Sequence, residues 1–173
     1  MLFASQAFGQ TTDDGTIDAT ANVLTAIEVT PGDDLQFGTL FQDETITLNV
    51  DANGDLDASS NAGQGDSDIS LGTFTISGSD GLNISLSFSG SAIETGLSGP
   101  GDAIPLNFNG TDSGWINLGT SSENFDPESG ALDFELGSDP VDVRIGAEIT
   151  ADANQEEGSY SGEITLTADY TDF

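Results

Sequence analysis

The side chains best suited to chemistry are a run of oxygen donors in the segment from residue 51 to residue 68. They alternate with small residues along the chain, and the candidate ligands are Asp51, Asn53, Asp55, Asp57, Asp66 and Asp68. Ca²⁺ takes about six to eight oxygen ligands from a flexible backbone, so this spacing suggests a calcium site. The EF-hand pattern is not met, because Leu56 stands where that motif needs glycine. A solvated acidic loop that binds no ion is the competing interpretation.

The chain contains no Cys and no His, and this excludes several kinds of catalysis. Nucleophilic Ser–His and Cys–His systems, most zinc sites and any imidazole base are ruled out. Glycoside hydrolysis needs only two carboxylates, but among so many acidic residues no pair stands out. We therefore expect that the protein is not an enzyme and needs no cofactor, calcium being the one ion that the sequence suggests.

Two residues are unusual in occurring once. Trp115 could stack on a sugar ring, although a single Trp is more often part of a core. Arg144 is the only basic residue, and its apolar neighbours Val143 and Ile145 predict a strand from which it points outward to pair with a carboxylate.

The net charge is extreme, because 31 acidic residues and one basic residue give a formal charge of −30. Such a surface repels the phosphates of nucleic acids and anionic lipids, so cations are the expected partners. Repulsion between carboxylates acts over roughly 10 Å at 0.1 M salt and about 3 Å at 1 M. This favours a halophilic source.

Short segments in which apolar and polar residues alternate predict an all-β fold. One strand is expected over Thr16–Thr30, where Ile17, Ala19, Ala21 and Val23 share a face, and core rows at Leu35, Phe37 and Leu40 and at Ile46, Leu48 and Val50. A hairpin is expected around Gly78–Gly81, between strands near Phe74–Ile76 and Leu82–Phe88. Several short strands with one polar face predict an antiparallel β-sandwich. No stretch is long and apolar enough to span a bilayer as a helix.

The last predicted strand, residues 158–170, has the clearest alternation. Its apolar face carries Tyr160, Gly162, Ile164, Leu166, Ala168 and Tyr170, and its other face is polar. Because it closes the sequence, the strand beside it must come from earlier in the chain or from another molecule. We therefore treat Tyr160, Ile164, Leu166, Ala168 and Tyr170 as a candidate acceptor edge.

The first 15 residues are set apart from the predicted domain, which covers residues 16–173. They contain an apolar patch of Leu2, Phe3, Ala4, Ala7 and Phe8. Small residues spaced for a signal peptidase make this patch compatible with the remnant of a secretory signal. An arm that packs as a donor strand is the alternative, and both interpretations stay open.

Three pieces of sequence occur in an order known from other proteins: Thr25–Thr30 leading into Leu35–Gly38, then Gly72–Gly78, then the closing strand. This order resembles the secreted bacterial domain-of-unknown-function family 4402. The closing strand is also similar to the end of spore-coat-U-type and archaic chaperone–usher pilins. That resemblance implies an incomplete immunoglobulin-like sandwich, completed by a strand from the next subunit's N-terminus. The present chain departs from those pilins in lacking their Cys pair and in its acidity.

Two functions follow as hypotheses. The first is a structural subunit of an extracellular filament or surface matrix, a homopolymer in which Leu2, Phe3, Ala4, Ala7 and Phe8 are donated head-to-tail to the acceptor edge. The second is a secreted monomeric module that binds polysaccharide or calcium. Both place the protein outside the cell or on its surface.

Overall fold

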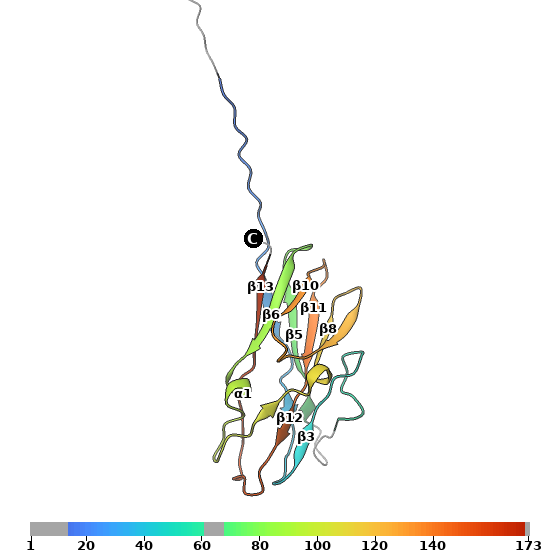
Figure 1. Cartoon of the computed structure of the whole chain (residues 1–173), viewed down its shortest axis with the longest axis vertical. Helices are drawn as coiled ribbons and strands as arrows, with labels where there is room; N and C mark the ends of the chain where they lie inside the picture. Colours follow the sequence, from blue (N-terminus) through green and yellow to red (C-terminus); the bar gives the residue numbers. More distant parts are fainter. Residues whose placement is uncertain (1–13, 61–67, 172–173) are drawn as a thin grey trace, which may run out of the picture.

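The computed structural model describes residues 14–60 and 68–171. These residues form an elongated domain from which an extended N-terminal segment projects (Figure 1). All strand pairs are antiparallel, and only one short helix and one 3₁₀ turn interrupt them within the described chain. The prediction of an all-β antiparallel sandwich is confirmed.

The larger sheet has five strands in the order β1-β5-β11-β8-β9. These strands are β1 (Glu28–Pro31), β5 (Gly72–Ser77), β11 (Val141–Ile145), β8 (Gly114–Asn117) and β9 (Ser122–Phe125). The three central strands are rich in β-branched and aromatic residues, which suit a pleated, half-buried surface.

A three-stranded sheet covers the inner face of the larger one, in the order β10-β6-β13. It consists of β10 (Leu132–Glu135), β6 (Asn83–Ser89) and β13 (Thr165–Tyr170). Between the two sheets, Ile76, Ile116 and Val143 pack with Ile84, Leu86 and Leu166 in one buried cluster. Alternation along each strand thus places its apolar side chains inward, as the period of two requires.

A second cluster of apolar residues fills the other half of the domain. A small sheet in the order β3-β12-β7 contributes to it, and β2 and β4 form a short pair beside it. These elements are β2 (Gln36–Phe37), β3 (Thr45–Thr47), β4 (Ile69–Ser70), β7 (Leu106–Asn107) and β12 (Glu148–Thr150), with α1 (Ser91–Glu94) and the 3₁₀ turn η1 (Gly110–Ser113). The predicted core row Ile46, Leu48 and Val50 is buried there.

The hairpin predicted around Gly78–Gly81 is wrong. The strands β5 and β6 on either side of these residues do not pair, because β5 lies between β1 and β11 while β6 lies between β10 and β13. The connection crosses from one sheet to the other. Glycine at a positive φ, as at Gly81, serves such a crossing as well as it serves a hairpin turn.

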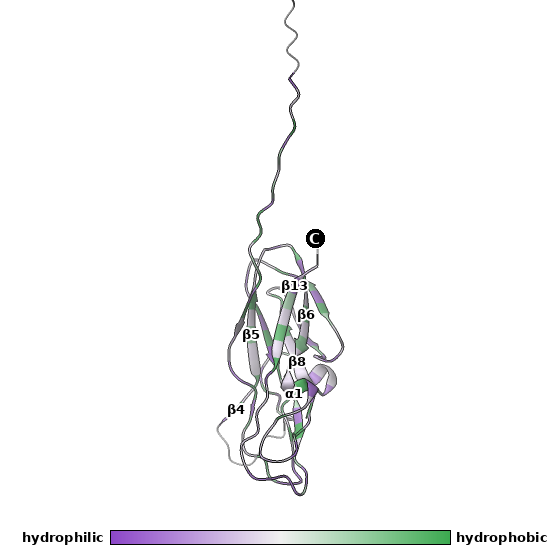
Figure 2. Cartoon of the chain, turned by 90° about the vertical axis from the view of Figure 1, so that its left-hand side faces the viewer, coloured by the Kyte–Doolittle hydropathy of each residue, from purple (hydrophilic) through white to green (hydrophobic). Residues whose placement is uncertain are grey.

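The strand predicted over Thr16–Thr30 is also shorter than expected. Only Glu28–Pro31 pairs with another strand, and residues 14–26 are exposed. We call residues 14–24 the arm. Figure 2 shows the arm leaving the domain at the end where β13 finishes. Its alternating pattern therefore has no partner within the described chain.

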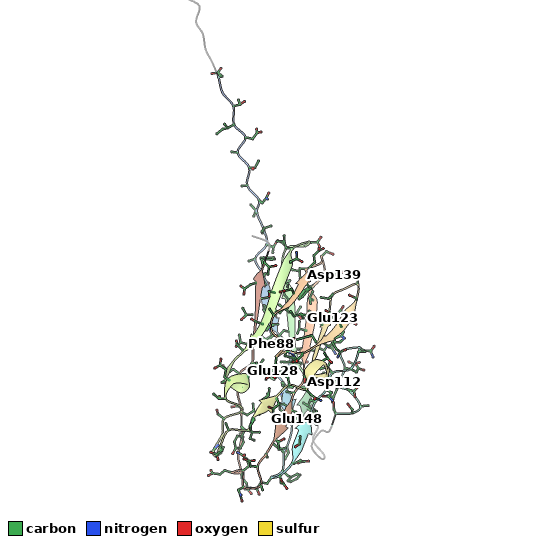
Figure 3. The ribbon with its side chains drawn as sticks, in the orientation of Figure 1. Phe88, Asp112, Glu123, Glu128, Asp139 and Glu148 are labelled. Carbon is green, nitrogen blue, oxygen red and sulfur yellow. The ribbon has the colours of Figure 1, made fainter. Side chains whose placement is uncertain are left out.

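Carboxylates are spread over the whole domain surface rather than gathered at one site. Asp112, Glu123 and Glu148 lie on different elements, and Glu128 and Asp139 lie in two different connections between strands (Figure 3). Across residues 14–60 and 68–171, no helix has the length and apolar character that crossing a bilayer would require.

Candidate functional site

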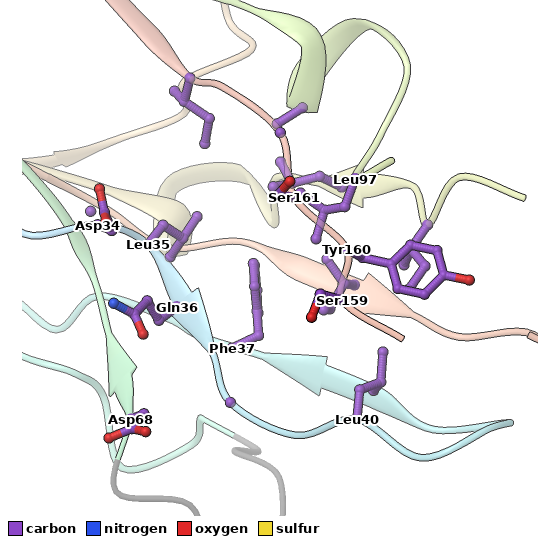
Figure 4. A pocket seen from close by; sticks show the side chains of 18 of the residues that line it. Asp34, Leu35, Gln36, Phe37, Leu40, Asp68, Leu97, Ser159, Tyr160 and Ser161 are labelled. Carbon is purple, nitrogen blue, oxygen red and sulfur yellow. The ribbon is translucent and has the colours of Figure 1, made fainter. Parts of the chain in front are cut away.

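A groove of about 1130 Å³ opens between two segments that are distant in sequence. One wall is the segment 31–42, which contains β2, and the other is the segment 155–165, which leads into β13. Figure 4 shows Leu35, Phe37 and Leu40 facing Tyr160 and Leu97 across this space. We refer to it as the groove.

The floor of the groove is apolar. Ile104, Leu106 and Ile149 line it and are almost fully buried, and Phe37 contributes its ring from one wall. These residues belong to the second core cluster, so the groove opens directly onto the core of that half of the domain. Partly buried residues, among them Leu40, complete the lining. Apolar side chains from another segment would therefore find matching surface there.

The wall formed by residues 155–165 pairs on one side only. Ser161 exchanges two backbone hydrogen bonds with Ser98, at 2.8 and 2.9 Å, and the carbonyl of Glu163 accepts one from Ala92 at 3.1 Å. In an extended chain the amide and carbonyl groups of successive residues point to opposite sides. Those of Tyr160 and Ile164 consequently point toward the groove, and no backbone hydrogen bond links them to any described residue.

The opposite wall is paired away from the groove. Gln36 and Phe37 of β2 pair with Ser70 and Ile69 of β4. Among the described residues, no backbone hydrogen bond joins residues 31–42 to residues 155–165. One end of the groove is closed by a side chain, because Gln42 Nε2 donates to the carbonyl of Gln155 at 2.6 Å. The groove is thus a gap between two segments that no backbone hydrogen bond joins among the described residues.

The rim of the groove is acidic although its floor is apolar. Carboxylates that line it are Asp33, Asp34, Asp68, Glu156, Glu157 and Glu163. An occupant must therefore bury apolar groups close to negatively charged carboxylates. An acidic occupant would be repelled unless salt screens the rim, whereas a cationic one would be attracted.

The arm starts from a fixed root at Thr25. The Tyr170 hydroxyl donates to the carbonyl of Thr25 at 2.9 Å, and the Thr25 amide donates to Ser79 Oγ at 2.7 Å. Beyond this root, Ile17 is 94% exposed and Val23 is 95% exposed. Two β-branched side chains on one face of an extended segment are thus left in water, and their burial elsewhere would be favourable.

The candidate calcium loop is organised by its own hydrogen bonds. Asp51 Oδ1 accepts from the amides of Asn53 and Asp55 at 2.8 and 2.9 Å, and Asp57 Oδ1 accepts from the Ser59 amide at 2.6 Å. The bond from the Asp55 amide, followed by that from Asn53, lowers the pKa of Asp51. The side chain and amide of Ser59 lower the pKa of Asp57.

These carboxylates act as turn-forming groups in the structure. No cluster of three or more His, Cys, Asp or Glu side chains suited to a metal occurs in the part of the chain that is described. Asp68 lies beside the groove, away from the arrangement around Asp51, and Asp66 lies outside the described residues. Calcium binding by this loop stays a prediction.

Arg144 points outward from β11 and pairs with a carboxylate, as the sequence predicts. Its Nη1 donates to the carbonyl of Gly54 at 2.7 Å and lies 3.2 Å from Asp55 Oδ1. The guanidinium also stacks at 5.4 Å from the ring centre of Trp115, which is buried and donates from Nε1 to the carbonyl of Ala52 at 3.1 Å. Both residues hold the acidic loop against the larger sheet, so they have a structural role here.

The site residues named from the sequence have different outcomes. Tyr160 and Ile164 lie along the groove wall, while Leu166, Ala168 and Tyr170 belong to β13, an edge strand of its sheet, and their side chains pack against the sandwich core. The segment 1–10, with Leu2, Phe3, Ala4, Ala7 and Phe8, lies outside the described residues. Sequence reasoning missed the second wall around Phe37. The alternation of apolar residues predicts that Phe37 is in the core, but it does not show that no strand pairs with this segment on the side of the groove.

Comparisons with known proteins identify the domain but not its activity. No curated protein and no solved structure matches the chain. The profile of one family matches residues 27–170, which includes both walls of the groove and excludes the arm. The chain therefore belongs to the family described as Domain of unknown function (DUF4402).

Proposed function

We propose that the protein is a structural subunit of an extracellular filament or surface matrix, which assembles when the N-terminal segment of one copy inserts into the groove of the next. The observation that carries this proposal is the groove itself. Its floor is apolar, and one wall presents backbone groups of Tyr160 and Ile164 that no described residue pairs. An added strand supplies both missing features, since its main chain pairs with an open edge and its alternate side chains bury in the floor.

The placement of arm and groove favours a chain of subunits. The root of the arm, Thr25, is bound to Tyr170 at the end of β13, whereas the groove lies beside the residues that precede Thr165 at the start of β13. Donor and acceptor are thus at different ends of the domain. In a head-to-tail contact of this kind, one subunit keeps a free arm and the other keeps a free groove. Further subunits can therefore add at both ends, and a filament grows.

The resemblance to pilins of the spore-coat-U and archaic chaperone–usher type supports the same proposal. In those proteins an incomplete sandwich receives a strand from the next subunit, and the described domain contains an open groove. A place outside the cell belongs to the proposal for the same reason. The proposal includes no catalysis.

The experiment compares the full-length chain with a variant that lacks residues 1–24. Deletion stops before Thr25, and the described residues that it removes make no hydrogen bond with the domain. We expect polymers from the full-length chain and monomers from the variant, measured by light scattering after size exclusion and by negative-stain microscopy. A synthetic peptide of residues 1–24 should bind the variant and raise its melting temperature, because binding to the folded state stabilises it.

Two results would overturn the proposal. The first is a full-length chain that stays monomeric at molar salt and at every concentration tested. The second is a variant without residues 1–24 that still forms filaments.

A further inference from the structure

We infer that the segment that enters the groove is Thr16–Leu24 of a second copy, with Ile17, Ala19, Ala21 and Val23 facing the floor. The inference rests on the proposed function and assigns the donor to residues that the sequence alone places in the domain. It replaces the expectation that the apolar patch within residues 1–10 is the part that inserts.

The pattern of the arm fits a strand that is buried on one face. Its apolar residues fall at odd positions, Ile17, Ala19, Ala21 and Val23, and Thr16, Asp18, Thr20 and Asn22 alternate with them. Such a period of two specifies an inward and an outward face. Ile17 and Val23 are nevertheless 94% and 95% exposed, so no described residue of the same chain covers the face that the pattern predicts to be buried.

The arm is long enough to line the groove wall. That wall, residues 155–165, bends at residues 157–158, where Gly158 has φ +149°, and residues 159–165 follow the bend. Nine residues in a strand span about 30 Å, at about 3.3 Å per residue, and these seven wall residues span at most about 23 Å. Thr16–Leu24 can therefore run along the whole of this part of the wall.

The arm cannot fill the groove of its own domain. The wall begins at Pro31, six residues after the fixed root at Thr25, and β1 occupies most of the path between them. An arm that folded back would need roughly 20 Å, or six residues, before it reached the wall. Only its first few residues would then lie in the groove, with Val23 still outside. A second copy has no such restriction.

Backbone pairing fixes where the arm lies within the groove. Beside the wall at Tyr160 and Ile164 the amides and carbonyls face an open edge, and an inserted strand can pair with them. In the wall around Phe37, by contrast, the backbone of β2 already pairs with β4. We therefore place the arm along residues 160–164, with its odd-numbered side chains directed at Ile104, Leu106 and Ile149.

The test uses three full-length double variants that carry the same number of substitutions. In the first, Ile17→Ser and Val23→Ser remove the apolar face of the arm. In the second, Thr20→Ser and Asn22→Ser alter its outward face, and in the third, Leu2→Ser and Phe8→Ser alter the N-terminal patch. Junction strength is measured as the concentration at which polymers dissociate, and polymers are counted by light scattering at 1 M salt.

The first variant is expected to weaken the junction at least about tenfold, because two aliphatic side chains that leave water on insertion are replaced by polar ones. The other two should resemble the unmodified chain. Loss of polymers only in the Leu2/Phe8 variant would overturn the inference and leave the proposed function standing. The inference would also be overturned if the polymers of all three variants dissociated at the same concentration. An unmodified chain that never polymerises would instead refute the proposed function itself.

Discussion

The Tyr170 hydroxyl joins the last strand to the root of the arm, since it donates to the carbonyl of Thr25 at 2.9 Å and accepts from the Ser79 amide at 2.6 Å. One side chain thus links three segments: the end of β13, the crossing between β5 and β6, and the first residues of the domain. The arm, residues 14–24, joins the domain next to this contact.

Replacing Tyr170 by Phe should loosen this root and lower stability by about 1 kcal/mol, the usual contribution of a hydrogen bond whose partners are accessible to water. Hydrogen exchange of residues 25–29 should rise. Tyr160→Phe is the matched control, because it removes hydrogen bonds to Gly101 and Gln155 at the other end of the domain. Unchanged exchange at residues 25–29 in Tyr170→Phe would show that the root is held by other contacts.

The contact between the acidic loop and Trp115 can be tested at Gly54. This residue has φ +84°, and a Cβ there would lie 2.7 Å from Trp115 Cε3. Gly54→Ala should destabilise the fold by more than about 1 kcal/mol, from backbone strain and from the displaced ring. Gly119→Ala is the control, since it has φ +81° and open space around it. The emission of Trp115, the only Trp, should shift in the first variant alone.

The sequence predicted which side chains of a strand face the core better than it predicted which strands pair with each other. Alternation correctly placed Ile46, Leu48 and Leu166 in the core, because the period of two depends only on local geometry. It could not show that β5 and β6 belong to different sheets, since a Gly-rich connection permits a hairpin and a crossing alike. Which strand lies beside which is decided by contacts between distant segments, and these leave no local signal.

The groove could be predicted in part for the same reason. The sequence names Tyr160 and Ile164 as part of a candidate acceptor edge, and the structure places both residues in the groove wall. The alternation of Ile17 and Val23 wrongly predicts a strand of the same domain, because the pattern shows that a face needs cover without showing which molecule provides it.

The pKa of Asp51 predicts how the acidic loop responds to pH. Hydrogen bonds from the amides of Asp55 and Asn53 hold this pKa below its ordinary value of 3.8. Because the folded pKa lies below the unfolded one, the stabilisation is present above about pH 4 and is lost as pH falls through the folded value. The stability difference between the unmodified chain and Asp51→Asn should therefore shrink as pH is lowered below 4.

Urea unfolding at a series of pH values measures this difference. Asp18→Asn is the control, because it removes the same charge from the arm, where the side chain makes no hydrogen bond to a described residue. A difference that stays constant from pH 6 to pH 2.5 would show that the ionised form of Asp51 does not stabilise the loop.

Salt should strengthen both the fold and the proposed junction, and the junction more steeply. Carboxylates of Asp33, Asp34 and Glu163 line the groove, and the arm brings Asp14 and Asp18 toward them. Lowering salt from 1 M to 0.05 M lengthens the range of their repulsion from about 3 Å to more than 10 Å. Polymers should therefore dissociate at low salt before the domain unfolds, as followed by light scattering and Trp115 fluorescence on the same samples. Asp18→Asn should reduce the salt dependence of the junction but leave that of unfolding almost unchanged, because residue 18 is exposed in its own domain and lies against a neighbour in the proposed junction. Equal salt dependence of the junction in both proteins would place Asp18 away from the acidic rim and contradict the insertion of this segment.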